Sequence, residues 1–217
     1  VTTSTLPLVP VPTQPVRDEF DQTQLNLCWN FLRNPDPATW SLAEKPGFLT
    51  LRGNNIILNE TGSPAFIGRR QQHFNCSATA QLEFNPQSEV EIAGITVLMN
   101  EKHHYDLYIK KEGDQRFVVL RLRIGSLTRI AYKEPITAGA IRLQISSDPK
   151  WYTFSYLPGG AREFIRAGNM ESRYLSSEVA GGFTGVYLGM FTEGGGGSEK
   201  TPVFFDWFEY TPDKNAK

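Results

Sequence analysis

The longest regular alternation of apolar and polar side chains in this chain runs from residue 76 to residue 84. A period of two puts every second residue on the same face of a β-strand, so the sequence predicts a strand with one buried face. Residues 69–73, just before it, read Arg-Arg-Gln-Gln-His, a polar cluster for which we expect a partner. The apolar members of the alternation are Cys76, Ala78, Ala80, Leu82 and Phe84.

Shorter stretches with the same period, separated by turns that contain glycine and proline, predict about a dozen strands in all. Segment 172–179 is the best helical candidate, and we find no internal repeat. Many short alternating strands with Gly and Pro turns are typical of a β-sandwich or a β-barrel. The further expected strands are 25–32, 40–42, 48–52, 91–99, 105–110, 117–124, 141–145, 151–156, 164–165, 185–191 and 203–210.

The domain organisation follows from composition along the chain. Residues 1–16 contain four prolines and no charge, which favours an extended linker, although a disordered tail is the alternative. Residues 17–211 form the predicted β-sandwich domain, and residues 212–217 form a short polar tail. A length of 217 residues suits one all-β domain. A chain that opens in a linker leads us to expect that it was cut from a longer protein.

The charge limits the classes of binding partner, and the cysteine content limits the number of disulfides. The formal net charge of −1, from 22 basic and 23 acidic residues, gives no long-range field that would hold nucleic acid or an anionic membrane. The chain contains neither an apolar run of the ~20 residues that a membrane span needs nor a signal segment, so its location stays unknown. Cys28 and Cys76 could form one disulfide at most, and we expect Cys76 to be a buried free thiol.

The sequence offers no convincing catalytic group. Acid–base work by carboxylates needs two facing side chains whose pKa values differ, and Glu89 and Glu91 are the nearest pair. They follow a turn, where solvated charges are usual. His103 and His104 are adjacent, so on a strand they would point to opposite faces and could not chelate one ion. We expect both histidines in a loop, and no serine nucleophile motif, phosphate loop or Cys–His pair is present.

Calcium is a better candidate than catalysis. Asp18, Glu19 and Asp21 cluster at the start of the predicted domain, and Asp206 lies near its end. Calcium takes about six to eight oxygen ligands, and an ion that joined the two ends would close a long loop. One interpretation is therefore a Ca²⁺ site formed by Asp18, Asp206 and a backbone carbonyl near Gly53. The other is that the carboxylates only solvate and cap a turn.

Sugar binding is a further candidate. Carbohydrate sites stack sugar rings on aromatic faces and surround them with amides and charged groups. Most aromatic residues of this chain alternate with polar ones and are more simply core residues. Trp151 and Tyr152 are adjacent on one predicted strand, so one of the two must leave the core side. That residue would be the sugar platform.

Several segments together carry a resemblance to a known family. In chain order they are RDEFD (17–21), WNFLRNP (29–35), WSLAEKPGFLTLRG (40–53), RRQQHFNC (69–76), GGFTGVYLGM (181–190) and FFDWFEY (204–210). This set resembles the C-terminal β-sandwich of family 43 glycoside hydrolases, and in particular that of the β-xylosidase and α-L-arabinofuranosidase branch. The resemblance covers the chain from about Arg17 to Tyr210, and RRQQHF with NFLRNP is its most specific part.

The resemblance implies a fold and a division of labour. The fold would be a concanavalin-like jelly roll, a β-sandwich of two antiparallel sheets, with its first and last segments paired at one edge. A structural calcium ion near Asp18 and Asp206 is common in such domains. The catalytic carboxylates of the family sit in an N-terminal five-bladed propeller that this chain does not contain. The partners implied are that propeller and a xylo- or arabino-oligosaccharide substrate.

The resemblance also assigns roles to particular residues. By its position in GGFTG, Phe183 corresponds to a phenylalanine that helps close the catalytic pocket, although a core role at a strand start is the alternative. We expect Arg69, Arg70, Gln71 and His73 to make polar contacts with the propeller. The leading interpretation is thus a non-catalytic accessory domain of a hemicellulose-degrading hydrolase. An independent carbohydrate-binding module for xylan-type glycans, and an enzyme in its own right, are the other two.

Overall fold

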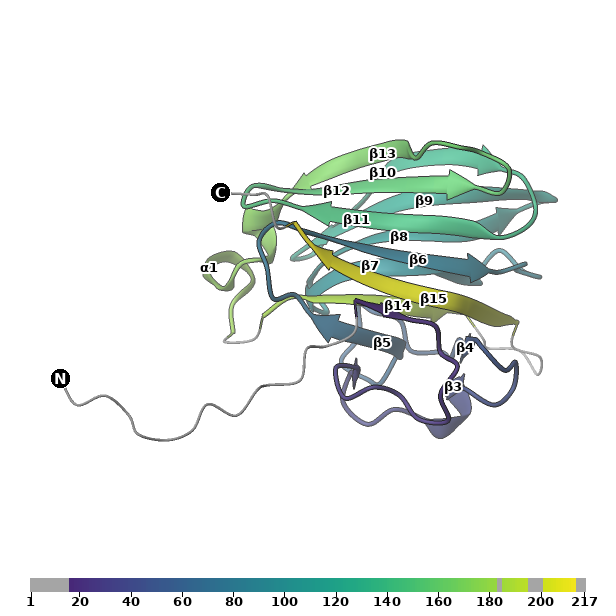
Figure 1. Ribbon diagram of the computed structural model, residues 1–217. Coiled ribbons are helices and arrows are strands. Elements are labelled where there is room, and N and C mark those ends of the chain that lie inside the picture. The colour runs from purple at the N-terminus through teal and green to yellow at the C-terminus, as the bar shows by residue number, and fades with distance from the viewer. Residues whose placement is uncertain (1–15, 183–184, 195–200, 214–217) are drawn as a thin grey trace, which may run out of the picture.

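The computed structural model describes residues 16–182, 185–194 and 201–213, and in these ranges the chain folds into two antiparallel sheets packed face to face (Figure 1). The predicted linker up to residue 15 and the tail from residue 214 lie outside the described residues. In spatial order, the eight-stranded sheet contains β13 (Ile165–Glu171), β12 (Trp151–Pro158), β11 (Ile141–Ser147), β6 (Cys76–Glu83), β15 (Pro202–Pro212), β4 (Leu49–Arg52) and β3 (Trp40–Ser41), with β1 (Arg17–Asp18) also paired to β15. The seven-stranded sheet contains β10 (Leu127–Ile136), β9 (Gln115–Ile124), β8 (His103–Glu112), β7 (Ile92–Asn100), β14 (Tyr187–Glu193), β5 (Ala65–Arg70) and β2 (Asn30–Phe31).

The core lies between the two sheets and uses the alternation seen in the sequence. All five apolar members of the 76–84 alternation are buried in it, as predicted. Apolar side chains of β7, β8, β9 and β14 face them from the other sheet. The all-β sandwich of two antiparallel sheets is therefore confirmed. Both cysteines are free, and Cys76 is buried as expected.

Several local predictions were wrong. Of the expected strand 25–32 only β2 forms, and Leu27 is fully exposed, because the chain turns between Asn26 and Trp29. The edge strand β10 was missed, since nearly all of its side chains are exposed and its apolar positions do not alternate cleanly. The first and last segments do pair, as β1 with β15, but β15 lies inside its sheet and not at an edge.

Short helices add little to the fold. They are the 3-10 helices η1 (Pro37–Thr39) and η2 (Ser172–Leu175) and the single α-helical turn α1 (Ser177–Ala180). The predicted helical candidate at 172–179 therefore exists as η2 followed by α1. Among the described residues, no helix is long and apolar enough to span a bilayer.

A buried ionic network crosses the outer face of the seven-stranded sheet. The carboxylate of Asp106 accepts hydrogen bonds from Thr96 Oγ1 (2.7 Å) and Arg121 Nε (2.8 Å) and lies 2.9 Å from Nδ1 of His104. Arg121 also donates through Nη2 to Glu193 Oε1 at 3.0 Å. These contacts join four adjacent strands, β9, β8, β7 and β14. Burial opposes the charge of Asp106, but His104 and Arg121 hold its pKa well below the usual range.

The segment before β5 covers this network and is fixed by it. The backbone N–H of Leu58 donates to Glu193 Oε1 at 3.1 Å, and Oδ1 of Asn59 lies 2.7 Å from Nε2 of His104. Leu58 itself packs in a second apolar cluster with Phe66 and Phe191 on the same face. The outer face of the seven-stranded sheet is thus covered by protein around the ionic network.

The two adjacent histidines behave only partly as expected. His103 and His104 lie in β8 and both are buried, so the loop placement was wrong. They do point to opposite faces, because Nδ1 of His103 lies 2.8 Å from the carbonyl of Tyr174 while His104 contacts Asp106. The conclusion that they cannot chelate one ion together is therefore confirmed.

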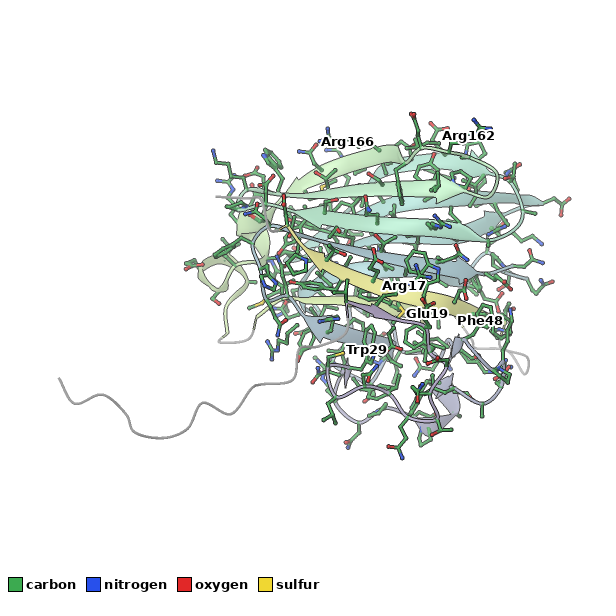
Figure 2. All side chains as sticks on the ribbon, in the orientation of Figure 1. Arg17, Glu19, Trp29, Phe48, Arg162 and Arg166 are labelled. Atoms are coloured by element: carbon green, nitrogen blue, oxygen red, sulfur yellow. The ribbon has the colours of Figure 1, made fainter. Side chains whose placement is uncertain are left out.

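The start of the domain is fastened by one carboxylate. Oδ2 of Asp18 accepts hydrogen bonds from Trp29 Nε1 (2.7 Å) and Asn26 Nδ2 (2.8 Å), and Oδ1 accepts the backbone N–H of Phe20 at 3.0 Å. Trp29 packs edge-on against Phe208 with ring centroids 5.1 Å apart. Figure 2 shows Trp29 on the side of the sandwich opposite Arg162 and Arg166. Asp18 therefore anchors the irregular segment 19–29 on β15.

The pKa of Asp106 predicts acid sensitivity. A depressed folded-state pKa adds stability that is complete above the unfolded-state value of about 4 and is lost as pH falls below it. We expect the melting temperature of the native chain to drop steeply below about pH 4. Asp106→Asn removes one partner of a buried pair, which costs about 3–5 kcal/mol at pH 7, and flattens this drop. Calorimetry between pH 2 and 7 measures both effects.

Glu112→Gln is the matched control for Asp106→Asn. Glu112 also has a lowered pKa, through hydrogen bonds from Lys133 and Lys110, but it is solvent-exposed, so its loss should change stability far less. If Asp106→Asn and the native chain lost stability in parallel as pH falls, the network would not be the source of the acid sensitivity.

The anchoring role of Asp18 predicts a second stability effect. Asp18→Ala leaves the buried indole N–H of Trp29 without its acceptor, and we expect it to cost about 2–4 kcal/mol in urea unfolding. Asp18→Asn keeps one acceptor oxygen and should cost less. Asp21→Ala is the control, because the exposed Asp21 accepts only from its neighbour Gln22. Equal effects at positions 18 and 21 would contradict the anchor.

Candidate functional site

The polar cluster 69–73 leads into a crossover between the two sheets. β5 ends at Arg70 in the seven-stranded sheet, and β6 begins at Cys76 in the eight-stranded sheet, so residues 71–75 bridge them at one end of the sandwich. The crossover is tied to the domain at both ends of the segment. The N–H of Gln71 donates to the carbonyl of Val186 at 3.0 Å, and the carbonyl of Asn75 accepts from the N–H of Asp213 at 2.9 Å.

The hydroxyl of Tyr210 holds the middle of the crossover. It accepts the backbone N–H groups of Gln72 (3.0 Å) and His73 (3.2 Å) and lies 3.1 Å from Nδ1 of His73. Two accepted bonds leave its single proton for that ring nitrogen, so the full capacity of a hydroxyl is used. Burial raises the pKa of Tyr210 to about 12, which keeps the hydroxyl protonated at neutral pH.

A second group of side chains, from Gln71, Ser147 and Tyr152, also fixes the crossover. The amide of Gln71 donates to the carbonyl of His73 (2.9 Å) and to Ser147 Oγ (3.1 Å), and its Oε1 accepts the hydroxyl of Tyr152 at 2.8 Å. Ser147 donates in turn to the carbonyl of Phe74 at 2.7 Å. Bonds within the domain therefore hold the backbone N–H groups of Gln71, Gln72 and His73 and the carbonyls of His73, Phe74 and Asn75.

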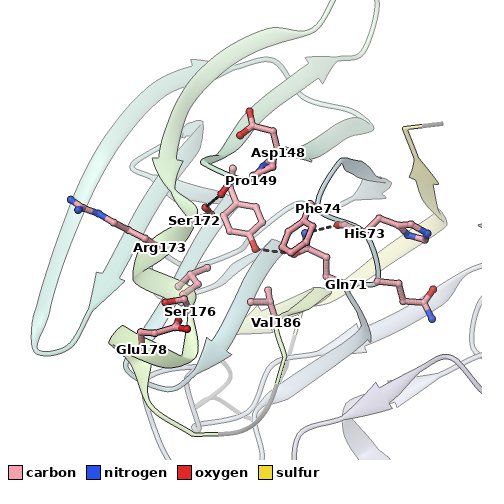
Figure 3. A pocket seen from close by; sticks show the side chains of 13 residues that line it. Gln71, His73, Phe74, Asp148, Pro149, Ser172, Arg173, Ser176, Glu178 and Val186 are labelled. Carbon is pink, nitrogen blue, oxygen red and sulfur yellow. Dashed lines mark hydrogen bonds between the residues drawn. The ribbon is translucent and has the colours of Figure 1, made fainter. Parts of the chain in front are cut away.

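The crossover presents one large apolar side chain to solvent. Phe74 is 76% exposed, although its carbonyl accepts the hydroxyl of Ser147. Beside it lies a pocket of about 560 Å³ (Figure 3), with Phe74 and Val186 near its centre and Arg173, Ser176 and Glu178 on the side of η2 and α1. The lining residues are Gln71, Gln72, His73, Phe74, Asp148, Pro149, Tyr152, Ser172, Arg173, Leu175, Ser176, Glu178 and Val186.

The predicted interface residues lie at this end of the sandwich but differ in availability. Arg69 is buried, 5% exposed, with its guanidinium 4.6 Å from the ring centroid of Tyr210. The side-chain amide of Gln71 is already hydrogen-bonded within the domain, as described above. Arg70 stacks on Tyr187 at 4.4 Å and donates to the carbonyl of Gly185 at 3.0 Å. Only Arg70 and His73 are exposed, and Phe183 lies outside the described residues.

The described contacts of the predicted calcium ligands do not bring these residues together into one site. Both oxygens of Asp18 already accept hydrogen bonds from N–H groups, whose positive ends point at the carboxylate. This arrangement suits a carboxylate that anchors the chain better than one that binds a cation. Asp206 accepts from Gln81 Nε2 at 2.6 Å. Gly53 lies against the backbone of Gly194, so closely that a Cβ would lie 2.1 Å from the carbonyl oxygen. Asp18 does not fit as a calcium ligand, and calcium stays a prediction.

Other metal or catalytic clusters are not found either. Within the described ranges, no group of three or more His, Cys, Asp or Glu side chains could hold a metal ion. Glu91 is buried and accepts the backbone N–H groups of Gln87, Ser88 and Thr201. Burial opposes this charge, but the hydrogen bonds lower the pKa of Glu91, which therefore fastens loops. Glu89 accepts the N–H of Gly113 at 2.9 Å.

The two candidate sugar-stacking residues separate as the alternation predicts. Tyr152 is buried, 5% exposed, and is bound to Gln71, so its ring belongs to the core. Trp151 is 39% exposed and faces the outer side of the eight-stranded sheet. Of the pair, Trp151 alone could serve as an aromatic platform.

Sequence reasoning missed Phe74. It was included in the RRQQHF motif but was not singled out, because the alternating strand was taken to begin just after it. Phe74 precedes Cys76 by two residues and is in phase with the apolar positions, so the pattern predicts a buried side chain and contains no local signal of its exposure. Asp106, the centre of the ionic network, was also missed, since a lone acidic residue in an alternating strand is usually solvated.

Comparisons with known proteins agree with this architecture. Over 198 residues the chain is 41% identical to a non-reducing end alpha-L-arabinofuranosidase of Bacteroides ovatus, which covers 91% of this chain and 37% of that protein. A xylan 1,3-beta-xylosidase of a Vibrio species is 31% identical, with coverage of 94% and 39%. A solved structure described as the GH43B protein of a Bacteroides ovatus xyloglucan locus superposes with a TM-score of 0.90 and 39% identity.

These matches also bound what the chain represents. The match to the solved structure covers 96% of this chain but only 41% of the chain in that structure. This chain therefore spans about two fifths of the length of these relatives. Residues 17–211 match the family model described as the beta xylosidase C-terminal concanavalin A-like domain. The chain belongs to this family of C-terminal domains of family 43 glycoside hydrolases.

Proposed function

We propose that this chain is the accessory β-sandwich of a β-xylosidase or α-L-arabinofuranosidase, that it packs on a catalytic five-bladed propeller, and that it helps close the active site there. The observation that carries the proposal is the family match over residues 17–211 together with coverage of only 37–41% of the relatives. The hydrolysis of xylosides or arabinosides of hemicellulose would then belong to the whole enzyme.

The described residues support a non-catalytic role for this domain. The two carboxylates nearest to each other on the outer face of the seven-stranded sheet, Asp106 and Glu193, are buried and share Arg121. Acid–base catalysis on a sugar requires carboxylates that reach the substrate and exchange protons. A carboxylate pair locked by a guanidinium beneath a covering segment suits structural support instead.

The pocket-closing role is assigned to Phe183. In the full-length parent enzyme, Phe183→Ala removes the aromatic wall that would exclude water and position the sugar, so we expect kcat/KM for an aryl xyloside or arabinoside to fall by about tenfold or more. The unfolding temperature should remain unchanged. The measurement is steady-state kinetics on the purified parent.

Phe164→Ala is the control for Phe183→Ala. Phe164 is a half-exposed phenylalanine before β13, at the end of the sandwich away from the pocket. It should leave kinetics unchanged. If Phe183→Ala kept full activity, Phe183 would have no part in the active site, whereas the assignment of the chain to an accessory domain would stand.

An independent carbohydrate-binding module is the second candidate, because Trp151 is exposed on the outer sheet face. In that case the domain should bind xylohexaose in calorimetric titration, and Trp151→Ala should weaken that binding. Stacking of a sugar on one exposed indole is worth about 1–2 kcal/mol, so the loss would be about tenfold in affinity or more. For the accessory role we expect no saturable heat from either form.

A further inference from the structure

We propose that the catalytic domain docks on the end of the sandwich around Phe74, with Phe74 as the anchor residue that inserts into it. The Phe74 face consists of the exposed side chain of Phe74, the pocket beside it and Val179, which follows the pocket-lining Glu178 on α1. This inference rests on the proposed function and specifies which surface performs it.

The first argument is preorganisation. The crossover 71–75 is held by Tyr210, Gln71 and Ser147 through bonds of 2.7–3.2 Å, so Phe74 is presented by a backbone that is already fixed. An aromatic side chain on a rigid backbone loses little conformational entropy when a partner covers it. Such side chains are the usual energetic centres of protein interfaces. An exposed phenylalanine held in this way has no role in the core.

The second argument is the shape and chemistry of the surroundings. The pocket next to Phe74 has an apolar floor that includes Leu175 and Val186, while Asp148, Arg173 and Glu178 stand around it. Apolar centres with charged rims are typical of specific protein interfaces. Val179 on α1, 47% exposed, extends the apolar surface beyond the pocket.

The third argument identifies the partner. The carbonyl of Val16 accepts the backbone N–H of Tyr210 at 2.7 Å, so the start of the domain lies beside the residue whose hydroxyl fixes the crossover. The family model is a C-terminal domain, and the remaining length of its relatives therefore precedes the residue that corresponds to 17. The covalent connection to the catalytic domain thus arrives at the Phe74 face.

The opposite end of the sandwich is a natural control. Phe164 and Ile165 are also half-exposed, but Ile165 pairs with Tyr156 at the far end of β12, whereas Tyr152 at the near end lines the pocket. Figure 2 shows the neighbouring Arg162 and Arg166 on β13 and its preceding loop, away from Trp29 and Arg17. Phe164 is therefore expected to stay open to solvent in the whole enzyme.

The test is hydroxyl-radical footprinting of the full-length parent enzyme, read by peptide mass spectrometry. The oxidation rates of Phe74 and Phe164 are compared within the same molecules, and the urea-unfolded enzyme provides the intrinsic rate of each peptide. We expect the oxidation of Phe74 to be lost while that of Phe164 persists, although Phe74 is the more exposed residue in the domain itself (76% against 39%). Phe74→Ser should restore oxidation of the neighbouring His73, whereas Phe164→Ser should not.

The alternative results are distinct from one another. Oxidation of Phe74 alongside protection elsewhere on this domain would overturn the Phe74 face but keep the proposed function, whereas uniform oxidation of the whole domain would overturn both. Protection that appears only after addition of xylohexaose would identify a sugar platform and overturn the proposal. Protection that grows with enzyme concentration would identify a second copy as the occupant, which also overturns it.

Discussion

The hydroxyl of Tyr210 is the interaction on which this end of the molecule depends. A chain that passes from one sheet to the other leaves strand pairing for five residues, and their peptide groups need partners that neither sheet provides. Tyr210 reaches across from β15 and supplies one hydroxyl to two N–H groups and one ring nitrogen. The guanidinium of Arg69 also stacks on the ring of Tyr210, and the backbone N–H of Tyr210 donates to the carbonyl of Val16. The crossover, the last strand and the first residues of the domain therefore form a single unit.

The outer face of the seven-stranded sheet also contains buried polar groups that need partners. Four strands there carry polar or charged side chains that could not be buried singly, since an isolated buried carboxylate would be too costly. Arg121 pairs with Asp106 and Glu193 together, and Leu58 and Asn59 then close over the network with hydrogen bonds of their own. This part of the sheet face is therefore used to attach a covering segment. At the crossover end, by contrast, an exposed apolar side chain lies beside a pocket.

The sequence predicted most of the strands because their buried faces alternate regularly, as from Cys76 to Phe84. It failed where tertiary contacts overrule the local pattern. Leu27 has the spacing of a strand residue, yet Asp18 draws segment 19–29 into an irregular path. β10 pairs with β9 at the edge of the sheet and shows little alternation. For the site, the RRQQH segment stands out in the sequence, but its internal partners do not. The pairing of Gln71 with Tyr152, 81 residues away, and of His73 with Tyr210 depends on which strands meet, and a single sequence does not encode that locally.

Part of the polar cluster predicted to be an interface serves as internal support. Arg69 and Gln71 find their partners inside the domain, whereas Arg70, His73 and the apolar Phe74 are open to solvent. The exposure of Phe74 has a physical reason. A phenylalanine on a mobile loop would fold back onto the nearest apolar surface, whereas hydrogen bonds from Tyr210, Gln71 and Ser147 hold the backbone on either side of Phe74. The polar side chains of the motif thus help the fold to maintain an exposed aromatic residue. In the proposed docking, the ordering of that residue would already be complete when the sandwich has folded, so the contact would gain affinity.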